Sequence, residues 1–435
     1  MNSTVRLESL TYTKRRKLAM QYEMCGFAAL AGAVLLGGVA AAEPLTGYHP
    51  EVAVKQATRL DWVFALGNQS REEPPADWLV DYDSAAQRYQ LFVPPNLNPR
   101  KPAPLVLFIS PGDQPAGWEQ WRSVCEQSGV VFASPLAAGN DCPTPRRVRI
   151  VFDVLDDIRQ TIDPDRTYLA GFSGGARIAC AVAFALPEYF GGVVPICGAE
   201  RLRKESWLRQ RVVDRLSVAL VTGDDDFNRA ELERYRGPLL KEVGVRTKVW
   251  AVPKLGHGIP QGDQLSAVLS WLDEAASERR RVAKQWPAMR IAGNAAPSRA
   301  DWAEALFNEA QKRLKKPSTL YSGLMQLQGI NVRWNDLPTA EKARELLADY
   351  DARNERVWEE YDLAEQRRFL IAEARAIDAY ASGPLPPQYE PQRVEMARAA
   401  LELWKQVFAD QPDTPAGKEA KERIGELEKI ADGGK

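Results

Sequence analysis

The chain has 435 residues, of which 45% are hydrophobic and 26% are charged, and its formal net charge at pH 7 is -1. This length is sufficient for two or three domains with a substantial core. The charge is nearly balanced, and the sequence has no stripe of basic residues with aromatic residues between them. Both features argue against a nucleic-acid partner.

The first 42 residues have the three parts of an export signal. Basic residues 14–17 precede an uncharged apolar run over residues 25–42, which ends in an Ala-x-Ala site before Glu43. We therefore expect residues 1–42 to be a signal peptide and the mature protein to be periplasmic or secreted. The alternative is a retained anchor facing outside, because 18 apolar residues are near the lower limit for spanning a bilayer. Only in that case would the protein meet a membrane.

Two tryptophans follow the first strongly apolar run, residues 105–110. Trp118 and Trp121 are three residues apart, a spacing that places both on one face of a helix. They either line the acyl side of a substrate cleft or pack into the core, and the sequence favours neither role.

Residues 171–175 read Gly-Phe-Ser-Gly-Gly, which is the G-x-S-x-G spacing of a nucleophile elbow. A strand-like segment precedes the motif and a helix-like segment follows it, as such an elbow requires. The serine of this turn takes a strained backbone conformation, and Gly171 and Gly175 are small enough for strand and helix to approach. We therefore expect Ser173 to be a nucleophile and Phe172 beside it to contact substrate. The alternative is a glycine-rich turn with an incidental serine.

Three consecutive aspartates follow the strand-like residues 217–222. Asp226 is the candidate for the acid that orients a catalytic histidine, since a Gly-x-x-Asp turn after such a strand commonly presents this acid. Asp224 and Asp225 would then cap the next helix or face solvent.

The chain contains two histidines, His49 and His257. His49 lies just past the expected cleavage site, in a segment predicted to be irregular. His257 occupies a glycine-flanked loop between a strand-like and a helix-like segment, and is therefore the expected base for Ser173. Two histidines so far apart, and no cysteine spacing typical of zinc, argue against a metal hydrolase; we expect no metal and no cofactor.

From residue 284 the composition changes to one rich in Ala, Glu, Arg and Leu, and strand-like alternation ends. Ser298 begins a helix-start signal, and further helices are expected over residues 337–381, broken near residue 351, and over 391–429, with a turn after residue 409. Two segments, at residues 334–347 and 408–424, are similar to each other and weakly resemble tetratricopeptide hairpins, which present a groove to a protein partner. A helical cap packed on the preceding domain is the alternative.

The segments FISPGD, AGFSGGARIACAVAFALPEYFGGVVPICG, VTGDDDFNR and LGHGIP, between about residues 84 and 280, resemble the α/β-hydrolase superfamily. Within it they are similar to polyhydroxybutyrate depolymerases and to feruloyl or dienelactone-type esterases. The resemblance implies a mostly parallel sheet flanked by helices, with Ser173, Asp226 and His257 gathered at the carboxyl ends of the strands. The expected domains are a hydrolase over residues 43–283 and an all-helical region over residues 284–435.

The family's oxyanion hole implies two backbone donors in this chain. One is the N–H of Gly174, directly after the nucleophile, and the other belongs to Asp113 or Gly112, after the third strand. Many family members carry His-Gly at that loop, whereas this chain carries Pro-Gly-Asp. An Asp113 carboxylate pointing inward would oppose a developing oxyanion, so either it faces solvent or the hole is weakened.

Removing the signal would leave four cysteines, an even number in an oxidising compartment. Local topology favours disulfides Cys125–Cys142 and Cys180–Cys197, and free buried thiols are the alternative.

Together these features predict an exported serine hydrolase that cleaves a carboxylic ester, small or polymeric, through an acyl-enzyme. A peptidase or amidase with the same triad is the second enzymatic interpretation. An inactive hydrolase-like protein, whose C-terminal helices recruit a protein partner, is the non-enzymatic interpretation.

Overall fold

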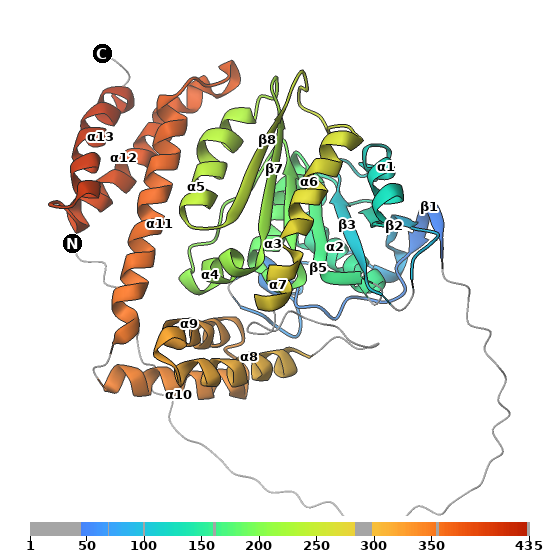
Figure 1. The fold of residues 1–435 in the computed structure, drawn as a ribbon, viewed down its shortest axis with the longest axis horizontal. Coiled ribbons are helices and arrows are strands. Elements are labelled where there is room, and N and C mark those ends of the chain that lie inside the picture. The colour runs from blue at the N-terminus through green and yellow to red at the C-terminus, as the bar shows by residue number, and fades with distance from the viewer. Residues whose placement is uncertain are drawn as a thin grey trace, which may run out of the picture. The chain divides into compact units, whose positions relative to one another are not determined.

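The computed structural model describes residues 45–67, 69–98, 101–159, 162–282, 298–353 and 356–432. Residues Leu45–Lys435 form one compact unit. Its centre is a sheet of eight strands: β1 Gly47–Ala53, β2 Arg88–Val93, β3 Ala103–Ile109, β4 Val131–Pro135, β5 Ile162–Phe172, β6 Gly192–Ile196, β7 Ser217–Gly223 and β8 Arg246–Val252. The strand order is β1-β2-β4-β3-β5-β6-β7-β8, and every pair from β4 to β8 is parallel, whereas β2 runs antiparallel to both neighbours (Figure 1).

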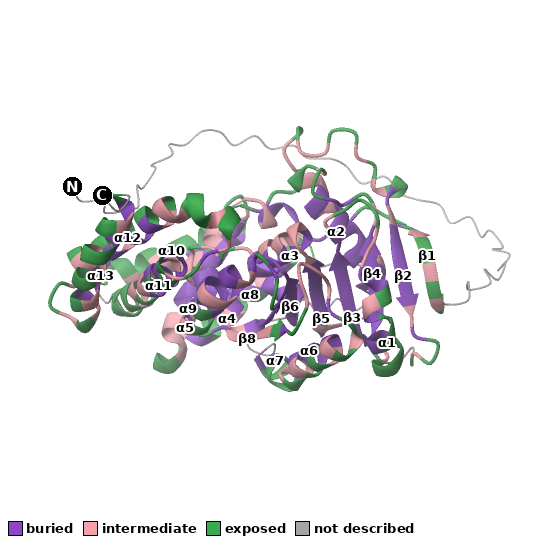
Figure 2. Ribbon diagram, turned by 90° about the horizontal axis from the view of Figure 1, so that it is seen from above, coloured by how far each residue is buried: buried purple, intermediate pink, exposed green. Residues whose placement is uncertain are grey.

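Helices cover both faces of this sheet. They are α1 Trp118–Ser128, α2 Thr144–Ile158, α3 Gly174–Ala185, α4 Ser206–Arg215, α5 Gly237–Glu242, α6 Gly262–Glu274 and α7 Ala276–Val282. The strands at the middle of the sheet are buried (Figure 2). Alternate residues of each buried strand face opposite layers: Val106 is in the apolar cluster of α1 and α6, and Leu105 is in that of α2 and α3. Both layers are apolar because both faces of a parallel sheet are buried. The fold is that of an α/β hydrolase.

The edge strand β1 differs from the sequence expectation. His49 was expected in an irregular lead-in, but it pairs with Leu91 of β2. The register of the pair shifts between His49 and Val52. Pro50 lies within this shift, and because proline cannot donate a ladder hydrogen bond, a bulged edge strand is where it is tolerated. The sequence around His49 predicted an irregular segment, and it did not indicate the neighbouring strand that pairs with it.

The C-terminal region is entirely helical in its described part, as expected. Its helices are α8 Arg299–Leu314, α9 Pro317–Arg333, α10 Pro338–Ala352, α11 Val357–Ser382, α12 Arg393–Asp410 and α13 Pro415–Ala431, with a short 3-10 segment, η6, at Pro387–Gln392. Ser298 caps α8 through a reciprocal capping box with Asp301, which confirms the predicted start signal. The predicted breaks after residues 351 and 409 are also confirmed, because α10 ends at Ala352 and α12 at Asp410.

Four of these helices share the apolar core on the α3 side of the sheet. Trp302 of α8, Ile330 of α9, Ala340 of α10 and Phe369 of α11 belong to the same buried cluster as the strands, whereas α12 and α13 pack with α11 in a separate cluster. The fit against α4 is tight, since a Cβ added at Gly329 of α9 would lie 2.7 Å from the Trp207 ring. The helices therefore bury part of the sheet domain's own core.

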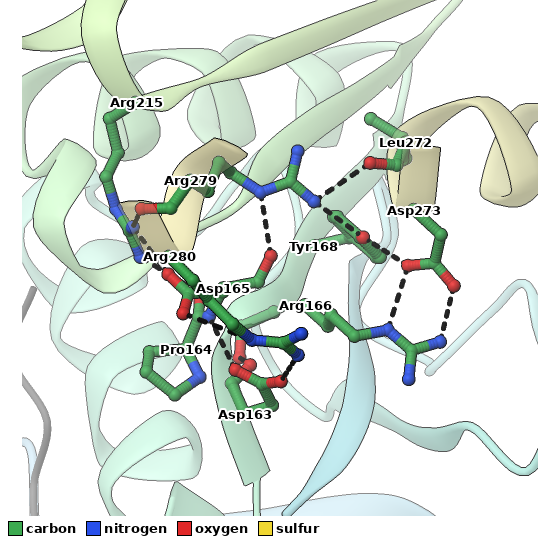
Figure 3. Close-up of polar contacts among 11 residues, drawn as sticks. Asp163, Pro164, Asp165, Arg166, Tyr168, Arg215, Leu272, Asp273, Arg279 and Arg280 are labelled. Carbon is green, nitrogen blue, oxygen red and sulfur yellow. Dashed lines mark hydrogen bonds and ion pairs between the residues drawn. The ribbon is translucent and has the colours of Figure 1, made fainter. Parts of the chain in front are cut away.

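The amino-terminal end of β5 is held by a polar network (Figure 3). Arg279 of α7 is 2% exposed and donates from Nε to the Asp165 carbonyl at 2.8 Å and from Nη2 to the Tyr168 hydroxyl at 3.0 Å. Arg215 of α4 reaches the Asp165 carboxylate at 2.6 Å. These bonds fix α4 and α7 against one end of the strand, and Ser173 follows its other end.

The cysteines are not paired. Cys125, Cys142, Cys180 and Cys197 are all free thiols, so the favoured disulfide pairing is wrong and the alternative of free thiols is correct. Cys180 and Cys197 belong to apolar clusters on opposite faces of the sheet, and Cys125 is buried in the core whereas Cys142 lies in a partly exposed loop. Sequence proximity favoured the pairs, but the sheet separates the side chains of Cys180 and Cys197.

Residues 1–42, the expected signal, lie outside the described residues, and so does the expected domain boundary at residues 283–284. Among the helices of the described part, none combines the length and the apolar character needed to cross a membrane.

Candidate active site

Ser173 stands on a sharp turn between β5 and α3. Its backbone has φ 54° and ψ -119°, a conformation that costs a non-glycine residue free energy and is typical of a nucleophile elbow. A Cβ at Gly171 would lie 2.6 Å from the Gly175 carbonyl group, and one at Gly175 would lie 2.1 Å from the Ile109 oxygen. The two glycines thus allow β5, α3 and β3 to approach as the motif predicts.

His257 lies between the serine and a carboxylate. Its Nε2 is 3.0 Å from Ser173 Oγ and its Nδ1 is 2.8 Å from Asp226 Oδ1. An ionised carboxylate only accepts hydrogen bonds, so Nδ1 is the donor and Nε2 is left to accept the serine proton. The structure therefore brings together the three residues that the sequence analysis selected, from segments that follow β5, β7 and β8.

Asp226 differs from its two neighbours in burial. Its side chain is fully buried, whereas Asp224 and Asp225 are exposed, and Asp224 forms an ion pair with Arg229 at 3.1 Å. Oδ2 of Asp226 accepts from the Thr222 hydroxyl at 2.7 Å. Burial raises the pKa of this carboxyl, but hydrogen bonds from His257, from the Asn228 backbone and from Thr222 outweigh burial and hold the pKa below its usual value. The carboxylate is thus kept ionised beside the imidazole.

Two phenylalanines flank the imidazole. The Phe172 ring centroid is 4.9 Å from that of His257, and the Phe227 ring is stacked on it at 4.1 Å with an interplanar angle of 23°. Phe227 is 39% exposed and His257 23%, so an aromatic surface and the imidazole are both open to solvent at the same place. Phe172 therefore lies beside the imidazole, and its contact with substrate stays a prediction; the sequence analysis did not identify Phe227.

Trp118 and Trp121 do not line this site. They are 5% and 0% exposed, and Trp118 packs against the rings of Tyr48, Phe92 and Phe132 under α1. The substrate-binding role is therefore wrong for both, and the core-packing alternative is correct. A spacing of three places two side chains on one helix face but does not say what that face meets.

The loop after β3 shows whether the Asp113 carboxylate points toward the place of an oxyanion or toward solvent. Asp113 is exposed, and its Oδ1 accepts from the Gly139 backbone N–H at 3.1 Å, so the carboxylate is held by another loop. Gly112 N–H already donates to Ser110 Oγ at 3.1 Å. Among the described residues, no hydrogen bond is found from the backbone N–H groups of Asp113 and Gly174. These two groups, rather than Gly112, are the available donors for an oxyanion.

Two residues beside the site, Asn140 and Cys197, were not identified as site residues from the sequence. Asn140 comes from a loop, and its side-chain oxygen would be 2.1 Å from a Cβ placed on Gly174. Cys197 follows β6 and has φ 55°, and its Sγ contacts the Gly258 carbonyl at 3.4 Å. A Gly-Asn turn and a cysteine after a strand are common features, and only the fold places them against the elbow.

One group of side chains has the donor types of a metal site. The ligand atoms of Cys197, Asp226 and His257 lie within 4.8 Å of one another. Burial raises the pKa of the Cys197 thiol to about 12, so the thiol is protonated at neutral pH and is a poor ligand. An ion there would also displace the hydrogen bond between Asp226 and His257. The arrangement suits proton transfer to and from Ser173 better than metal binding.

No family model matches the chain. It is 26% identical over 156 residues to a probable carboxylesterase described as SOBER1-like from Arabidopsis thaliana, an alignment that covers 32% of this chain and 55% of the relative. The chain thus spans about half the length of the curated relative that it matches.

Among solved structures, the chain is similar to a thermostable esterase, with 22% identity, a TM-score of 0.31 and coverage of 46% of this chain and 58% of that one. It is also similar to the S-formylglutathione hydrolase FrmB of Staphylococcus aureus, with 12% identity, a TM-score of 0.36 and coverage of 53% and 99%. The SOBER1 protein of Arabidopsis thaliana is 17% identical, with a TM-score of 0.31 and coverage of 40% and 98%.

Proposed function

We propose that this protein is a serine hydrolase that cleaves carboxylic esters through an acyl-enzyme. The observation that carries the proposal is the continuous hydrogen-bonded chain from Ser173 Oγ through His257 to the buried Asp226, at 3.0 and 2.8 Å. The similarity of part of the chain to a probable carboxylesterase supports an ester rather than an amide as the substrate.

The proposed reaction has two halves. Ser173 Oγ attacks the ester carbonyl carbon while His257 Nε2 takes the serine proton, and the N–H groups of Gly174 and Asp113 stabilise the oxyanion that forms. The imidazolium then protonates the departing alcohol, which leaves an acyl group on Ser173. A water molecule, deprotonated by His257, attacks this acyl group and releases the carboxylic acid and free serine. Asp226 keeps the imidazole in the required tautomer throughout.

Labelling with a fluorophosphonate tests the proposal, since such probes phosphonylate an activated serine. We expect labelling of the parent protein, its loss in Ser173→Ala and a strong reduction in His257→Ala. Ser270→Ala is the matched control, because this exposed hydroxyl of α6 bonds only to the Ser266 carbonyl among the contacts of the described residues. The parent and the control should also hydrolyse p-nitrophenyl esters.

Other outcomes identify the alternatives. Labelling together with peptide turnover and no ester turnover would favour a peptidase or amidase. A folded parent that neither labels nor hydrolyses esters would contradict the proposal and favour the binding-protein interpretation. The binding-protein interpretation draws its support from the altered oxyanion loop, and the exposed position of the Asp113 carboxylate weakens that support.

We also propose that residues 1–42 direct export and are removed, as the Ala-x-Ala site supports. N-terminal sequencing of the mature protein should begin at Glu43. We further propose that the substrate is of the kind cleaved by polyhydroxybutyrate depolymerases or feruloyl esterases, which a screen of polymer substrates would test. We also propose that the C-terminal helices bind a protein partner as tetratricopeptide hairpins do, which a partner search would test.

A further inference from the structure

A tyrosine from the C-terminal helical region reaches the turn that carries Asp226. The hydroxyl of Tyr389, in η6, donates to Asn228 Oδ1 at 2.7 Å, although the two residues are 161 positions apart. The segment that carries Tyr389 is held at two points. Leu385, before the tyrosine, is buried in the core, and Arg393, after it, donates to the Gly383 carbonyl at 2.9 Å. The tyrosine is therefore presented by an anchored loop rather than by a free end.

Asn228 links this tyrosine to Asp226, which follows β7, and to Cys197, which follows β6. Its backbone N–H donates to Asp226 Oδ1 at 3.0 Å, the same oxygen that accepts from His257 Nδ1. Its side-chain Nδ2 donates to the Cys197 carbonyl at 2.8 Å. Tyr389 donates to the amide oxygen of Asn228, so the amide nitrogen of Asn228 is the end that faces Cys197. With its side chain held at both ends, Asn228 keeps its backbone N–H in position to donate to Asp226.

We infer that Tyr389 is a positioning residue for the triad, which acts through Asn228 to hold the Asp226 carboxylate in line with His257. The inference rests on the proposed function. It assigns a role in the site to the helical region: the Tyr389 hydroxyl holds Asn228, which bonds the acid, and three hydrogen bonds connect the tyrosine to the imidazole.

The surroundings keep Tyr389 a hydrogen-bond donor. Burial and the nearby Glu231 carboxylate raise the pKa of Tyr389 above its usual value, and Arg177 opposes this only in part. Glu231 itself is bound by Arg177 at 2.7 Å and by Arg236 at 2.9 Å, so the charges beside the tyrosine are paired with each other. The hydroxyl thus remains protonated at neutral pH and Asn228 is its partner.

The test compares Tyr389→Phe with Tyr380→Phe. Tyr380, in α11, is buried whereas Tyr389 is half-buried, and the Tyr380 ring is stacked on Tyr235 at a centroid distance of 6.4 Å. In Tyr389→Phe we expect kcat for a p-nitrophenyl ester to fall about five- to tenfold with KM nearly unchanged, since a typical hydrogen bond is worth about 1 kcal/mol. Tyr380→Phe should leave both constants unchanged. In an Asn228→Ala background, Tyr389→Phe should cause no further loss, because the tyrosine acts through that amide.

A second readout does not depend on turnover. The chain has two histidines, so in protein labelled with ¹⁵N-histidine the Nδ1–H signal of His257 is assigned by its loss in His257→Gln. This signal should shift in Tyr389→Phe and stay in place in Tyr380→Phe. An unchanged kcat together with an unchanged His257 signal in Tyr389→Phe would overturn the inference. If the parent neither labels with fluorophosphonate nor hydrolyses esters, the proposed function fails, and the signal comparison alone then decides whether Tyr389 positions the pair.

Discussion

At the scale of single residues, the site depends on contrasts between neighbours of the same type. Asp224, Asp225 and Asp226 are consecutive, yet only Asp226 is buried, and it is bonded to His257 and Thr222. Its carboxylate is acceptor-only and ionised, so it selects the imidazole tautomer with the proton on Nδ1. The proposed base can then accept from Ser173 on its other nitrogen.

Asp226→Asn should therefore lower kcat for ester hydrolysis on the order of 10³- to 10⁴-fold with little change in folding, because an amide can hold the wrong tautomer. Steady-state kinetics and circular dichroism measure the two effects. Asp225→Asn is the matched control, since this exposed side chain lies next to Asp226 in the sequence. Equal losses of kcat in the two variants would contradict the assigned acid.

At the scale of elements, the elbow is a close contact of three backbones. β5 ends at Phe172, α3 starts at Gly174, and Gly175 lies directly against Ile109 of β3. The strained φ of Ser173 is held by this packing, because neither element can move away without opening the core on both sides of the sheet.

Gly175→Ala should abolish fluorophosphonate labelling and lower the midpoint of thermal unfolding, since the new Cβ would lie 2.1 Å from the Ile109 oxygen. Gly425→Ala provides the control: this exposed glycine of α13 has no neighbour within 4 Å of an added Cβ. There the substitution should stabilise by roughly 0.5–1 kcal/mol, because alanine is the better helix former. Normal labelling in Gly175→Ala would contradict the proposed packing constraint.

At the scale of the whole molecule, the helical region is joined to the sheet domain by buried charge as well as apolar surface. Arg333, the last residue of α9, is fully buried; it pairs with Asp61 at 2.9 Å and with Glu188 at 2.5 Å. Glu188 also pairs with Arg211 of α4 at 2.9 Å. We expect the two regions to unfold together, since separating them would leave these charges unpaired.

Arg333→Leu should lower the free energy of unfolding at pH 7 by about 3–5 kcal/mol, because it removes this buried cation from Asp61 and leaves Glu188 with Arg211 alone. Burial raises the pKa of Glu188, but Arg211 and Arg333 outweigh it and hold the pKa below its usual value. Stability from such a group is present above its unfolded pKa of about 4.3 and is lost as the pH falls through the lower folded value. The difference between variant and parent should therefore shrink as the pH falls below about 4.

Urea titrations at pH 7 and at acid pH measure this dependence. The control is Arg281→Leu, which removes an exposed arginine paired with Glu278 and should leave the free energy of unfolding nearly unchanged at either pH. A loss for Arg333→Leu that is equally small, or that grows as the pH falls, would show that the buried network does not stabilise the molecule.

The sequence alone indicated the strands and helices that flank the candidate triad, and the triad itself, but not the edge strand β1. The triad was identified from three local patterns: G-x-S-x-G between a strand and a helix, an aspartate after a later strand, and a histidine in a chain with few histidines. Their order in the chain restricts which residues can meet. In the C-terminal region the cap at Ser298 and the breaks near residues 351 and 410 were predicted in the same way, whereas α9, Pro317–Arg333, was not predicted.

Only the tertiary structure decided which surface each side chain meets. Local periodicity could not show that Trp118 and Trp121 face the core, nor that Cys180 and Cys197 lie on opposite sides of the sheet. It also could not bring Tyr389 to Asn228, because their contact joins segments 161 residues apart. Such contacts depend on how the layers pack, and packing is decided by the whole chain rather than by a short segment of it.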